Sequence, residues 1–440
     1  MKTIKFILND REVETELPAG TVTLDFIRRE QGLSGAKEGC REGECGSCTI
    51  LLGELQNRRV KYKAVVSCLL PIGELHGKHV VTVEGLNSDK LTPVQQALVD
   101  QGAVQCGFCT PGIVLSLTGF LLSEEAPAYP AAIDALDGNI CRCTGYVSIR
   151  RAAESLCTTI LEKSCLSGKN SKQKKIVSDG LPAGGGAPLA EKAGKDKNGN
   201  NGAVPELVEW GVVPRYFLDI PARLEALDAP APAPNSTKVK KILAAGATDM
   251  YVQKGEEAAG LELDFLSRYP ELSGIKEEGE KIFIGAGTNT EEIKNSSLLA
   301  RFVPGIKEYL SLVASKLIRS RATIGGNIAN ASPIADLTIF FLALKADIVL
   351  GKGSREREMP LAKFFKGYKQ LGLRKGEKIF GIKFPKPEAG AFFNFEKVSR
   401  RKYLDIASCD SAIYLTLQNG EAFSGDKGKP KASEANQKFL

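Results

Sequence analysis

The sequence has 440 residues, of which 43% are hydrophobic and 25% charged, as is usual for a soluble globular protein of two or three domains. The net charge of +7 is carried by residues 163–204, with 8 Lys against 3 acidic residues, and by residues 424–440, with 4 Lys against 2. Both segments have the composition of unfolded chain, and the remainder is balanced, so no folded surface is predicted to bind nucleic acid.

The numbers of histidines and cysteines limit the kinds of active or metal site that the chain can form. Only two histidines, His76 and His79, are present, which leaves little material for a zinc hydrolase or a His-based catalytic triad. The start of the sequence does not have the pattern of a signal peptide, and no apolar run approaches about 18 residues, so we expect a cytoplasmic protein without a membrane span. Eleven cysteines in such a chain indicate metal or redox chemistry rather than structural disulfides.

Residues 1–86 are predicted to form the first domain. Alternating patterns over Thr3–Leu8 and Val13–Leu17 indicate a β-hairpin. A helix is expected near Leu24–Gln31, a loop rich in Gly and Cys follows, and His79–Glu84 is expected to close the domain as a strand.

Residues 87–165 are predicted to be helical. Thr92-Pro93 and Thr110-Pro111 are typical of helix starts, because threonine can cap a helix and proline is tolerated at its first position. The expected four-helix bundle consists of Pro93–Gln101, Pro111–Ser123, Ala131–Leu136 and Val147–Lys163.

The rest of the chain is predicted to contain a linker, a third domain and a tail. Residues 166–204 lack the apolar content for a core and read as a flexible linker. Short strands alternate with helices over residues 205–423, and residues 424–440 form a polar tail. The sequence therefore predicts a multidomain α+β protein.

Eight of the cysteines fall into two sets of four. The first, Cys40, Cys45, Cys48 and Cys68, has the C-x4-C-x2-C spacing, with a distant fourth cysteine, of plant-type [2Fe–2S] proteins. The second consists of Cys106, Cys109, Cys141 and Cys143, each pair directly ahead of an expected helix start. Helix N-termini offer free N–H groups to an anionic cluster. The alternatives for each set are a zinc site or ordinary buried cysteines, and zinc has more weight for the second set, because CxxC pairs commonly bind zinc.

Two segments of the third domain suggest a ligand loop. Thr323-Ile-Gly-Gly-Asn327 continues to Asp336, and its paired glycines would let the backbone approach a phosphate or ribose closely. Gly-Gly-Asn alone fits a plain turn equally well. A second candidate loop, Leu243–Asp249, lies upstream.

These motifs together resemble the xanthine dehydrogenase/aldehyde oxidase family. The resemblance rests on Cys40–Thr49, Gln105–Gly112 and Asn139–Tyr146 for two cluster loops, and on Thr323–Asp336 for an FAD loop. It implies a β-grasp plant-type ferredoxin domain, a four-helix [2Fe–2S] bundle and an FAD-binding domain of the two-subdomain type. Residues after Glu421 no longer follow the family, so we expect the C-terminal part of that domain to be missing.

The resemblance also implies cofactors and site residues. The two cysteine sets would bind two [2Fe–2S] clusters, and Gln105 and Cys143 would approach a molybdopterin held by a partner. Lys397 is expected near the isoalloxazine, with a solvated surface lysine as the alternative. The FAD-binding residues are expected to be Leu243, Ala244, Ala245, Gly246, Ala247, Thr248, Asp249, Ala322, Thr323, Gly325, Gly326, Asn327, Asp336 and Lys397.

The function implied is electron transfer. A molybdopterin-binding large subunit would oxidise xanthine or hypoxanthine, and this chain, like the small subunit of the two-subunit bacterial form, would carry the electrons through both clusters and FAD to NAD+. No residue of this chain is expected to act on the substrate, and the assembly is expected to be a dimer of heterodimers. The alternatives are the equivalent subunit of an aldehyde or N-heterocycle (nicotinate-type) hydroxylase, and a ferredoxin-like carrier with a degenerate flavin domain.

Overall fold

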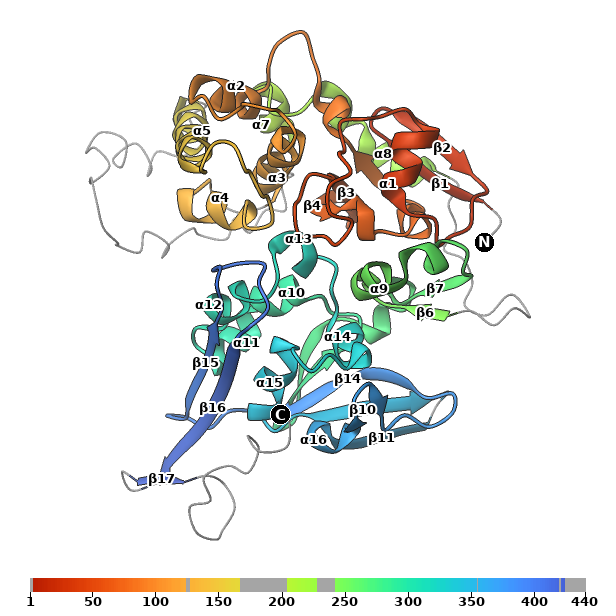
Figure 1. Cartoon of the computed structure of the whole chain (residues 1–440), viewed down its shortest axis with the longest axis vertical. Coiled ribbons are helices and arrows are strands. Elements are labelled where there is room, and N and C mark those ends of the chain that lie inside the picture. Colours follow the sequence, from red (N-terminus) through yellow and green to blue (C-terminus); the bar gives the residue numbers. More distant parts are fainter. Residues whose placement is uncertain are drawn as a thin grey trace.

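The computed structural model describes residues 3–123, 127–166, 204–227, 242–353, 355–418 and 421–423. Most of the predicted linker, residues 167–203, and the whole predicted tail, residues 424–440, lie outside the described residues. Figure 1 shows the two N-terminal domains side by side above the third domain. Among the described helices, none combines the length and apolar character needed to cross a membrane.

A five-stranded sheet organises the first domain, with the order β2-β1-β5-β3-β4. The predicted hairpin is confirmed, because β1 pairs with β2 in antiparallel register from Ile4↔Thr15 to Leu8↔Arg11. The short helix α1 continues into one wide turn, Phe26–Glu30, and packs on the sheet with Leu24 and Phe26 buried. The elements are β1 (Ile4–Leu8), β2 (Arg11–Thr15), α1 (Thr23–Asp25), β3 (Thr49–Gln56), β4 (Arg59–Val66) and β5 (His79–Val81).

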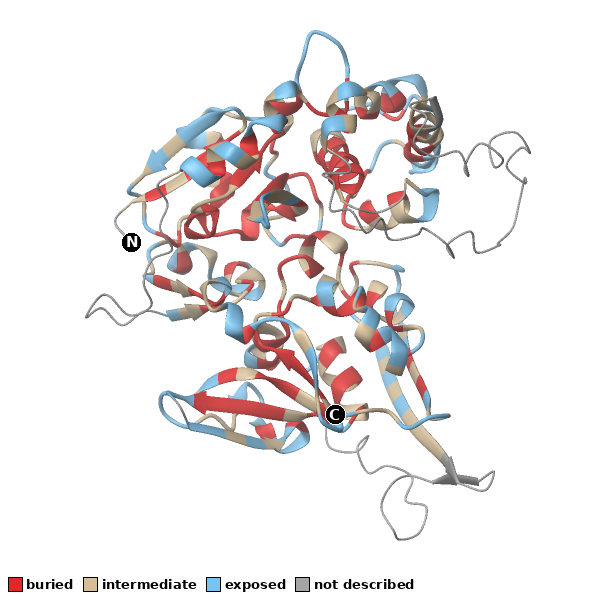
Figure 2. Ribbon diagram, turned by 180° about the vertical axis from the view of Figure 1, so that it is seen from behind, coloured by how far each residue is buried: buried red, intermediate tan, exposed pale blue. Residues whose placement is uncertain are grey.

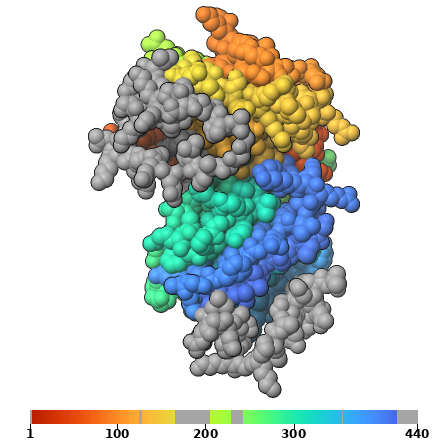
Figure 3. Space-filling view, turned by 90° about the vertical axis from the view of Figure 1, so that its left-hand side faces the viewer, coloured from red at the N-terminus to blue at the C-terminus, as the bar shows by residue number. Residues whose placement is uncertain are grey.

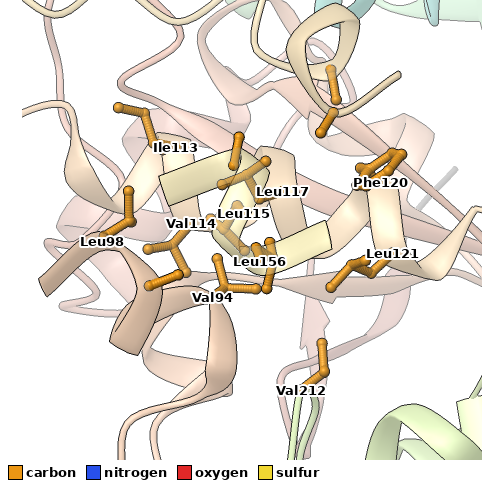
Figure 4. Close-up of a cluster of buried hydrophobic side chains, with 14 of the residues drawn as sticks. Val94, Leu98, Ile113, Val114, Leu115, Leu117, Phe120, Leu121, Leu156 and Val212 are labelled. Atoms are coloured by element: carbon orange, nitrogen blue, oxygen red, sulfur yellow. The ribbon is translucent and has the colours of Figure 1, made fainter. Parts of the chain in front are cut away.

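Four helices form the second domain, as predicted: α2 (Pro93–Asp100), α3 (Thr110–Leu122), α4 (Tyr129–Ala135) and α5 (Val147–Leu166). Thr92 caps α2 in a capping box with Gln95. Thr110 does not cap α3, since the helix already includes it and the cap position falls on Cys109. Figure 4 shows the core of the bundle, where α3 places Ile113 and Phe120 among the buried side chains.

Residues 204–227 pack on the two N-terminal domains, although the sequence placed them in the third domain. Val212 and Phe217 belong to the core of the bundle, whereas Ile220 and Leu224 pack against Ile7 of β1. The segment contains α7 (Val204–Glu209), a 3-10 turn (Arg215–Leu218) and α8 (Ile220–Ala226). The segment therefore contacts both N-terminal domains before the chain enters the third.

The third domain combines a parallel pair, β6 and β7, with a five-stranded antiparallel sheet of order β11-β10-β14-β9-β8. Its first half contains β6 (Ile242–Ala244), α9 (Thr248–Ala259), β7 (Leu263–Phe265), β8 (Ile275–Glu278), β9 (Lys281–Gly285), α10 (Thr290–Lys294), α11 (Ser297–Phe302), α12 (Ile306–Ser311), α13 (Lys316–Arg319), α14 (Ile324–Asn330) and α15 (Asp336–Ala343). Its second half contains β10 (Asp347–Lys352), β11 (Arg355–Pro360), α16 (Leu361–Phe364), β12 (Phe365–Gly367), β13 (Gln370–Leu371), β14 (Lys378–Pro385), β15 (Phe392–Val398), β16 (Cys409–Gln418) and β17 (Glu421–Phe423).

The last strands, β15 and β16, lie beside the helices of the third domain. Tyr309 of α12 stacks edge-on against Phe393 of β15, with ring centroids 5.8 Å apart. Figure 3 shows this face, where the blue C-terminal strands adjoin the teal helices. Figure 2 shows that buried residues run through all three domains. The predicted multidomain α+β fold is confirmed.

Candidate functional site

The first cysteine loop, residues 40–48, turns sharply ahead of β3. Arg41, Gly43 and Gly46 have positive φ angles of 56°, 77° and 66°, a conformation that glycine adopts without strain. The turn aims backbone groups at the sulfurs, and the N–H of Glu42 lies 3.4 Å from Cys40 Sγ. Such N–H groups stabilise the negative charge of a thiolate-bound cluster.

The four thiols of the first set gather as two pairs. Cys40 is hydrogen bonded to Cys45, and Cys48 to Cys68. The bond between Cys40 and Cys45 raises the pKa of Cys40 and lowers the pKa of Cys45 to about 5. Cys48 and Cys68 are buried, whereas Cys40 and Cys45 are partly exposed. The loop and the 3-10 turn Ser67–Leu69 thus contribute to one site.

The second set also divides into two pairs. Cys106 Sγ lies 3.4 Å from Cys143 Sγ, and Cys109 is hydrogen bonded to Cys141. Cys109 and Cys141 are buried, while Cys106 and Cys143 are exposed. Cys109 immediately precedes α3, and Cys141 lies in the turn ahead of α5, where its sulfur is 3.1 Å from Thr144 Oγ1. One pair therefore faces the protein and the other faces solvent.

This pairing fits a two-iron cluster. Each iron of a [2Fe–2S] cluster binds two cysteine thiolates, whereas a zinc site brings four donors around one point. The donor sets thus suit two [2Fe–2S] clusters, and the assignment of the eight cysteines as their ligands stays a prediction.

The two cysteine sets lie against each other. The N–H of Ile140 donates to the carbonyl oxygen of Cys45 at 3.0 Å, and Asn139 Nδ2 donates to the carbonyl oxygen of Gly46 at 3.3 Å. A methyl group on Gly112, in the first turn of α3, would lie 2.2 Å from that same carbonyl oxygen. Only glycine allows the first loop to approach the bundle so closely.

A cavity of about 420 Å³ lies in the third domain, within the size range of small-molecule sites. It is formed where the loop after β6 meets the start of α14. Of the predicted FAD residues, those lining the cavity are Leu243, Ala244, Ala245, Gly246, Ala247, Thr248, Asp249, Ala322, Thr323, Gly325, Gly326 and Asn327. Two distant sequence segments predicted to bind one cofactor are thus brought to one site.

The residues present fit a phosphate-bearing cofactor. Helices α9 and α14 both begin at the cavity, and the start of a helix favours an anion. At α14 the N–H groups of Ile324, Gly325 and Gly326 already donate to Thr288, Ala286 and Thr323, so α9 is the better candidate. A methyl group on Gly326 would lie 3.2 Å from Ala245 Cβ, so the two loops are nearly in contact. The buried Oδ1 of Asn327 has no hydrogen-bond partner among the described residues, as expected of a group that awaits a ligand donor.

Asp336 and Lys397 do not line this cavity. Lys397 Nζ donates to Asp336 Oδ2 at 2.8 Å and to the carbonyl oxygen of Leu312 at 3.1 Å. The Lys397 side chain is only 3% exposed, which rules out the surface-lysine alternative. Burial raises the pKa of Asp336 to about 6, although the bond and charge of Lys397 act in the opposite direction. The role of this pair towards a flavin stays a prediction.

Other cavity residues were not predicted from the sequence. Met250 and Gln253 follow the first loop on α9, and a methionine or glutamine on a helix has no distinguishing pattern. Ala286, Leu373 and Ile379 reach the cavity from the central sheet and the chain leading into it. Their position depends on strand pairing between β9 and β14, which no local sequence motif predicts.

Three family models match the chain. Residues 6–72 match the 2Fe-2S iron-sulfur cluster binding domain, and residues 82–154 match the [2Fe-2S] binding domain. Residues 224–387 match the FAD binding domain in molybdopterin dehydrogenase. The order of these matches follows the order of the two cysteine sets and the cavity along the chain.

The chain also matches relatives that are about three times its length. The chain is 31% identical over 447 residues to xanthine dehydrogenase/oxidase of Rattus norvegicus, covering 94% of this chain and 33% of that protein. It is 30% identical over 452 residues to xanthine dehydrogenase of Emericella nidulans, covering 95% and 33%. For aldehyde oxidase 4 of Cavia porcellus the identity is 27% over 456 residues, covering 95% and 33%. The chain spans about a third of the length of these relatives, and its matches are consistent with the 2Fe–2S/FAD part of the xanthine dehydrogenase family.

Proposed function

We propose that this chain is the electron-transfer subunit of a molybdenum hydroxylase that oxidises xanthine or hypoxanthine, with NAD+ as the final acceptor. The eight paired cysteines would hold the two [2Fe–2S] clusters, and the cavity loops at residues 243–249 and 322–327 would hold FAD. When bound, the clusters carry single electrons, and FAD collects two of them and releases them as a hydride.

The observation that carries this proposal is an unbroken series of contacts from exposed thiols to the cavity. Cys106 and Cys143 face solvent, and the loop around Cys141 bonds to the first cysteine loop. A methyl group on Gly43 of that loop would lie 2.6 Å from Cδ1 of Ile318. Ile318 belongs to α13, which leads directly into the cavity residues Ala322 and Thr323. The order supports transfer from a surface donor through both sites to the flavin.

Exposed apolar side chains close in sequence to the exposed thiols support a partner. Val104, Phe108, Tyr146 and Val147 are 39%, 45%, 37% and 60% exposed and lie within a few residues of Cys106 or Cys143 in sequence. We call these four residues the thiol-side patch. Clustered exposed apolar side chains are typical of interaction sites. The partner proposed is the molybdopterin-binding large subunit, and a dimer of heterodimers is the proposed assembly.

The proposal can be tested on the purified chain and on the complex. Anaerobically purified chain should contain about four irons and four acid-labile sulfides, with one FAD. It should pass electrons from NADH to an artificial dye, and it should oxidise xanthine only after the large subunit is added. Stoichiometric zinc in place of iron, or xanthine turnover by the chain alone, would contradict the proposal.

A second candidate substrate class has specific support. The match to an aldehyde oxidase over 95% of this chain makes an aldehyde or N-heterocycle hydroxylase the alternative. Assay of the complex with xanthine, a benzaldehyde and nicotinate separates the two candidates. A ferredoxin-like carrier with a degenerate flavin domain is the third candidate, and absence of FAD from chain that retains both clusters would favour it.

A further inference from the structure

We propose that Arg321 and Glu74 are positioning residues that hold the FAD cavity in register with the first cysteine site. This inference rests on the proposed function, and it concerns an ion pair between the first and third domains. Neither residue belongs to a cysteine set, and neither lines the cavity.

Arg321 connects the two cavity loops, residues 243–249 and 322–327. Its Nη2 donates to the carbonyl oxygen of Gly246 at 3.1 Å, in the loop after β6. Its own backbone is also in close contact with that loop, because a methyl group on Gly246 would lie 2.1 Å from the carbonyl oxygen of Arg321. The next residues along the chain, Ala322 and Thr323, line the cavity. A displacement of the Arg321 side chain therefore displaces both walls.

The second terminal nitrogen of the Arg321 guanidinium contacts the first domain. Its Nη1 donates to Glu74 Oε2 at 2.7 Å, and the two side chains are 7% and 2% exposed. Glu74 lies in the 3-10 turn Ile72–Leu75, shortly after Cys68 along the chain. Its second oxygen accepts a hydrogen bond from Ser267 of the third domain at 2.7 Å. Glu74 is thus held mainly by the opposite domain, through Arg321 and Ser267.

The chemistry of the ion pair indicates that it orients the first and third domains relative to each other, rather than simply stabilising their association. Two buried charges lose their hydration, so such a pair contributes less to stability than apolar packing of the same size would. A guanidinium, however, has several donors in one rigid plane and can fix two partners at once. Here it fixes the Gly246 carbonyl and the Glu74 carboxylate. One side chain therefore links the turn after Cys68 to both cavity loops, in addition to the apolar packing of Leu317 and Ile318 on the first domain.

The functional consequence follows from the steep dependence of electron transfer on distance. Loosening the cavity wall by roughly 1–2 Å would leave each cofactor bound while slowing exchange between them. Arg321→Met removes both contacts, whereas Arg321→Lys keeps the charge but cannot serve two partners in one plane. Glu74→Gln keeps the hydrogen-bonding shape, removes the charge and leaves the contact of Arg321 with Gly246 in place.

The matched control is another ion pair between domains. Lys294 Nζ of α10 donates to Asp134 Oδ2 of α4 at 2.7 Å, and neither residue touches the cavity. Asp134→Asn therefore removes an interdomain charge pair without affecting the link between Gly246 and Glu74.

The experiment uses full chain carrying both clusters and FAD. The flavin is reduced with NADH, and reduction of the clusters is followed by stopped-flow absorbance. FAD content, cluster signals in electron paramagnetic resonance and the rate of flavin reduction by NADH are measured alongside. We expect cluster reduction in Arg321→Met to slow about tenfold or more, with a smaller effect for Arg321→Lys and Glu74→Gln and little change for Asp134→Asn.

Each outcome decides the proposal. Slower cluster reduction with unchanged cluster signals and flavin reduction supports it, and so does loss of FAD in Glu74→Gln, whose side chain lies outside the cavity. Wild-type rates in both Glu74→Gln and Arg321→Met overturn it, as does equal slowing in Asp134→Asn. If the wild-type chain itself binds FAD but never reduces its clusters, the proposed function fails instead.

Discussion

The backbone N–H of Ile140 donates to the carbonyl oxygen of Cys45 at 3.0 Å, so a main-chain bond joins the loops of the two cysteine sets. The neighbouring residue of the first loop, Gly46, has a φ angle of 66°, and a methyl group there would lie 2.4 Å from the carbonyl oxygen of Gly138. The junction between the two loops therefore depends on a residue without a side chain.

Gly46→Ala should destabilise the protein by more than the conformational cost alone. Gly32 also has a positive φ angle, 68°, but a methyl group there meets nothing within 4 Å. Gly32→Ala should thus cost about 1 kcal/mol in the free energy of unfolding, and Gly46→Ala several times as much. Denaturant unfolding of both variants, with iron content as a second measurement, checks this. Equal costs would show that the two loops separate without penalty.

Replacing one cysteine of each set should remove one cluster at a time. Cys45→Ser should lower the iron content from about four to about two and abolish one electron paramagnetic resonance signal, and Cys141→Ser should abolish the other. Cys409→Ser is the control, because this exposed cysteine of β16 belongs to neither set. Loss of both signals in either variant would mean that the eight thiols do not form two independent sites.

Gly326→Val should lower FAD content while leaving the iron content unchanged. A side chain at Gly326 already comes within 3.2 Å of Ala245 at its first carbon, and two further methyl groups would occupy the space between the two loops. The control is Gly255→Ala in α9, where a methyl group meets nothing within 4 Å, and this variant should keep its full FAD content. Full FAD occupancy in Gly326→Val, measured by absorbance after denaturation, would place the flavin elsewhere.

Local patterns in the sequence predicted much of this arrangement. The hairpin, the four helices and the cap at Thr92 follow from periodicity and cap chemistry within a few residues. The two cavity loops were identified by resemblance, and folding brings them together through partners far apart in sequence. Cysteine spacing likewise identified the two sets, whose division into pairs only the structure shows.

Long-range packing was beyond the reach of the sequence. Residues 204–227 have an ordinary amphipathic pattern, and nothing local tells that Phe217 packs in the bundle core. Arg321 and Glu74 are separated by 247 positions, so no motif links them. Lys397 could have been a surface side chain or a buried one, and only the packing of strands β15 and β16 beside α15 brings it next to Asp336.

A charge in the thiol-side patch should weaken the partner without harming the clusters. Val147 is 60% exposed at the start of α5, so Val147→Lys should cost little stability. Burying that lysine under a partner should slow substrate-dependent reduction of the clusters and lower affinity for the large subunit about tenfold or more. Leu91→Lys is the control, because Leu91 is 53% exposed in the same domain but outside the patch. Equal affinity for both variants would exclude this face as the docking surface.

The stability contributed by Glu74 should depend on pH in the acid range. Burial by itself raises the pKa of Glu74, but the charges of Arg321 and Lys78, with the bonds from Arg321 and Ser267, outweigh it and hold the pKa at about 2. Arg268 also directs its charge towards this carboxylate. Because a free glutamate has a pKa near 4.5, the folded protein favours the ionised form, and this contribution is complete above about pH 5.

As the pH falls from about 4.5 towards 2, the carboxylate takes up a proton only at a cost to the folded state, and up to about 3 kcal/mol of stability is lost. The difference in unfolding free energy between wild type and Glu74→Gln should therefore be largest near pH 6 and shrink as the pH approaches 3. The comparison uses the difference in unfolding free energy between wild type and Glu74→Gln. The effect of acid on the clusters cancels in this difference, because both proteins lose sulfide alike. A difference that stays constant from pH 6 to pH 3 would mean that Glu74 gains nothing from Arg321 when ionised.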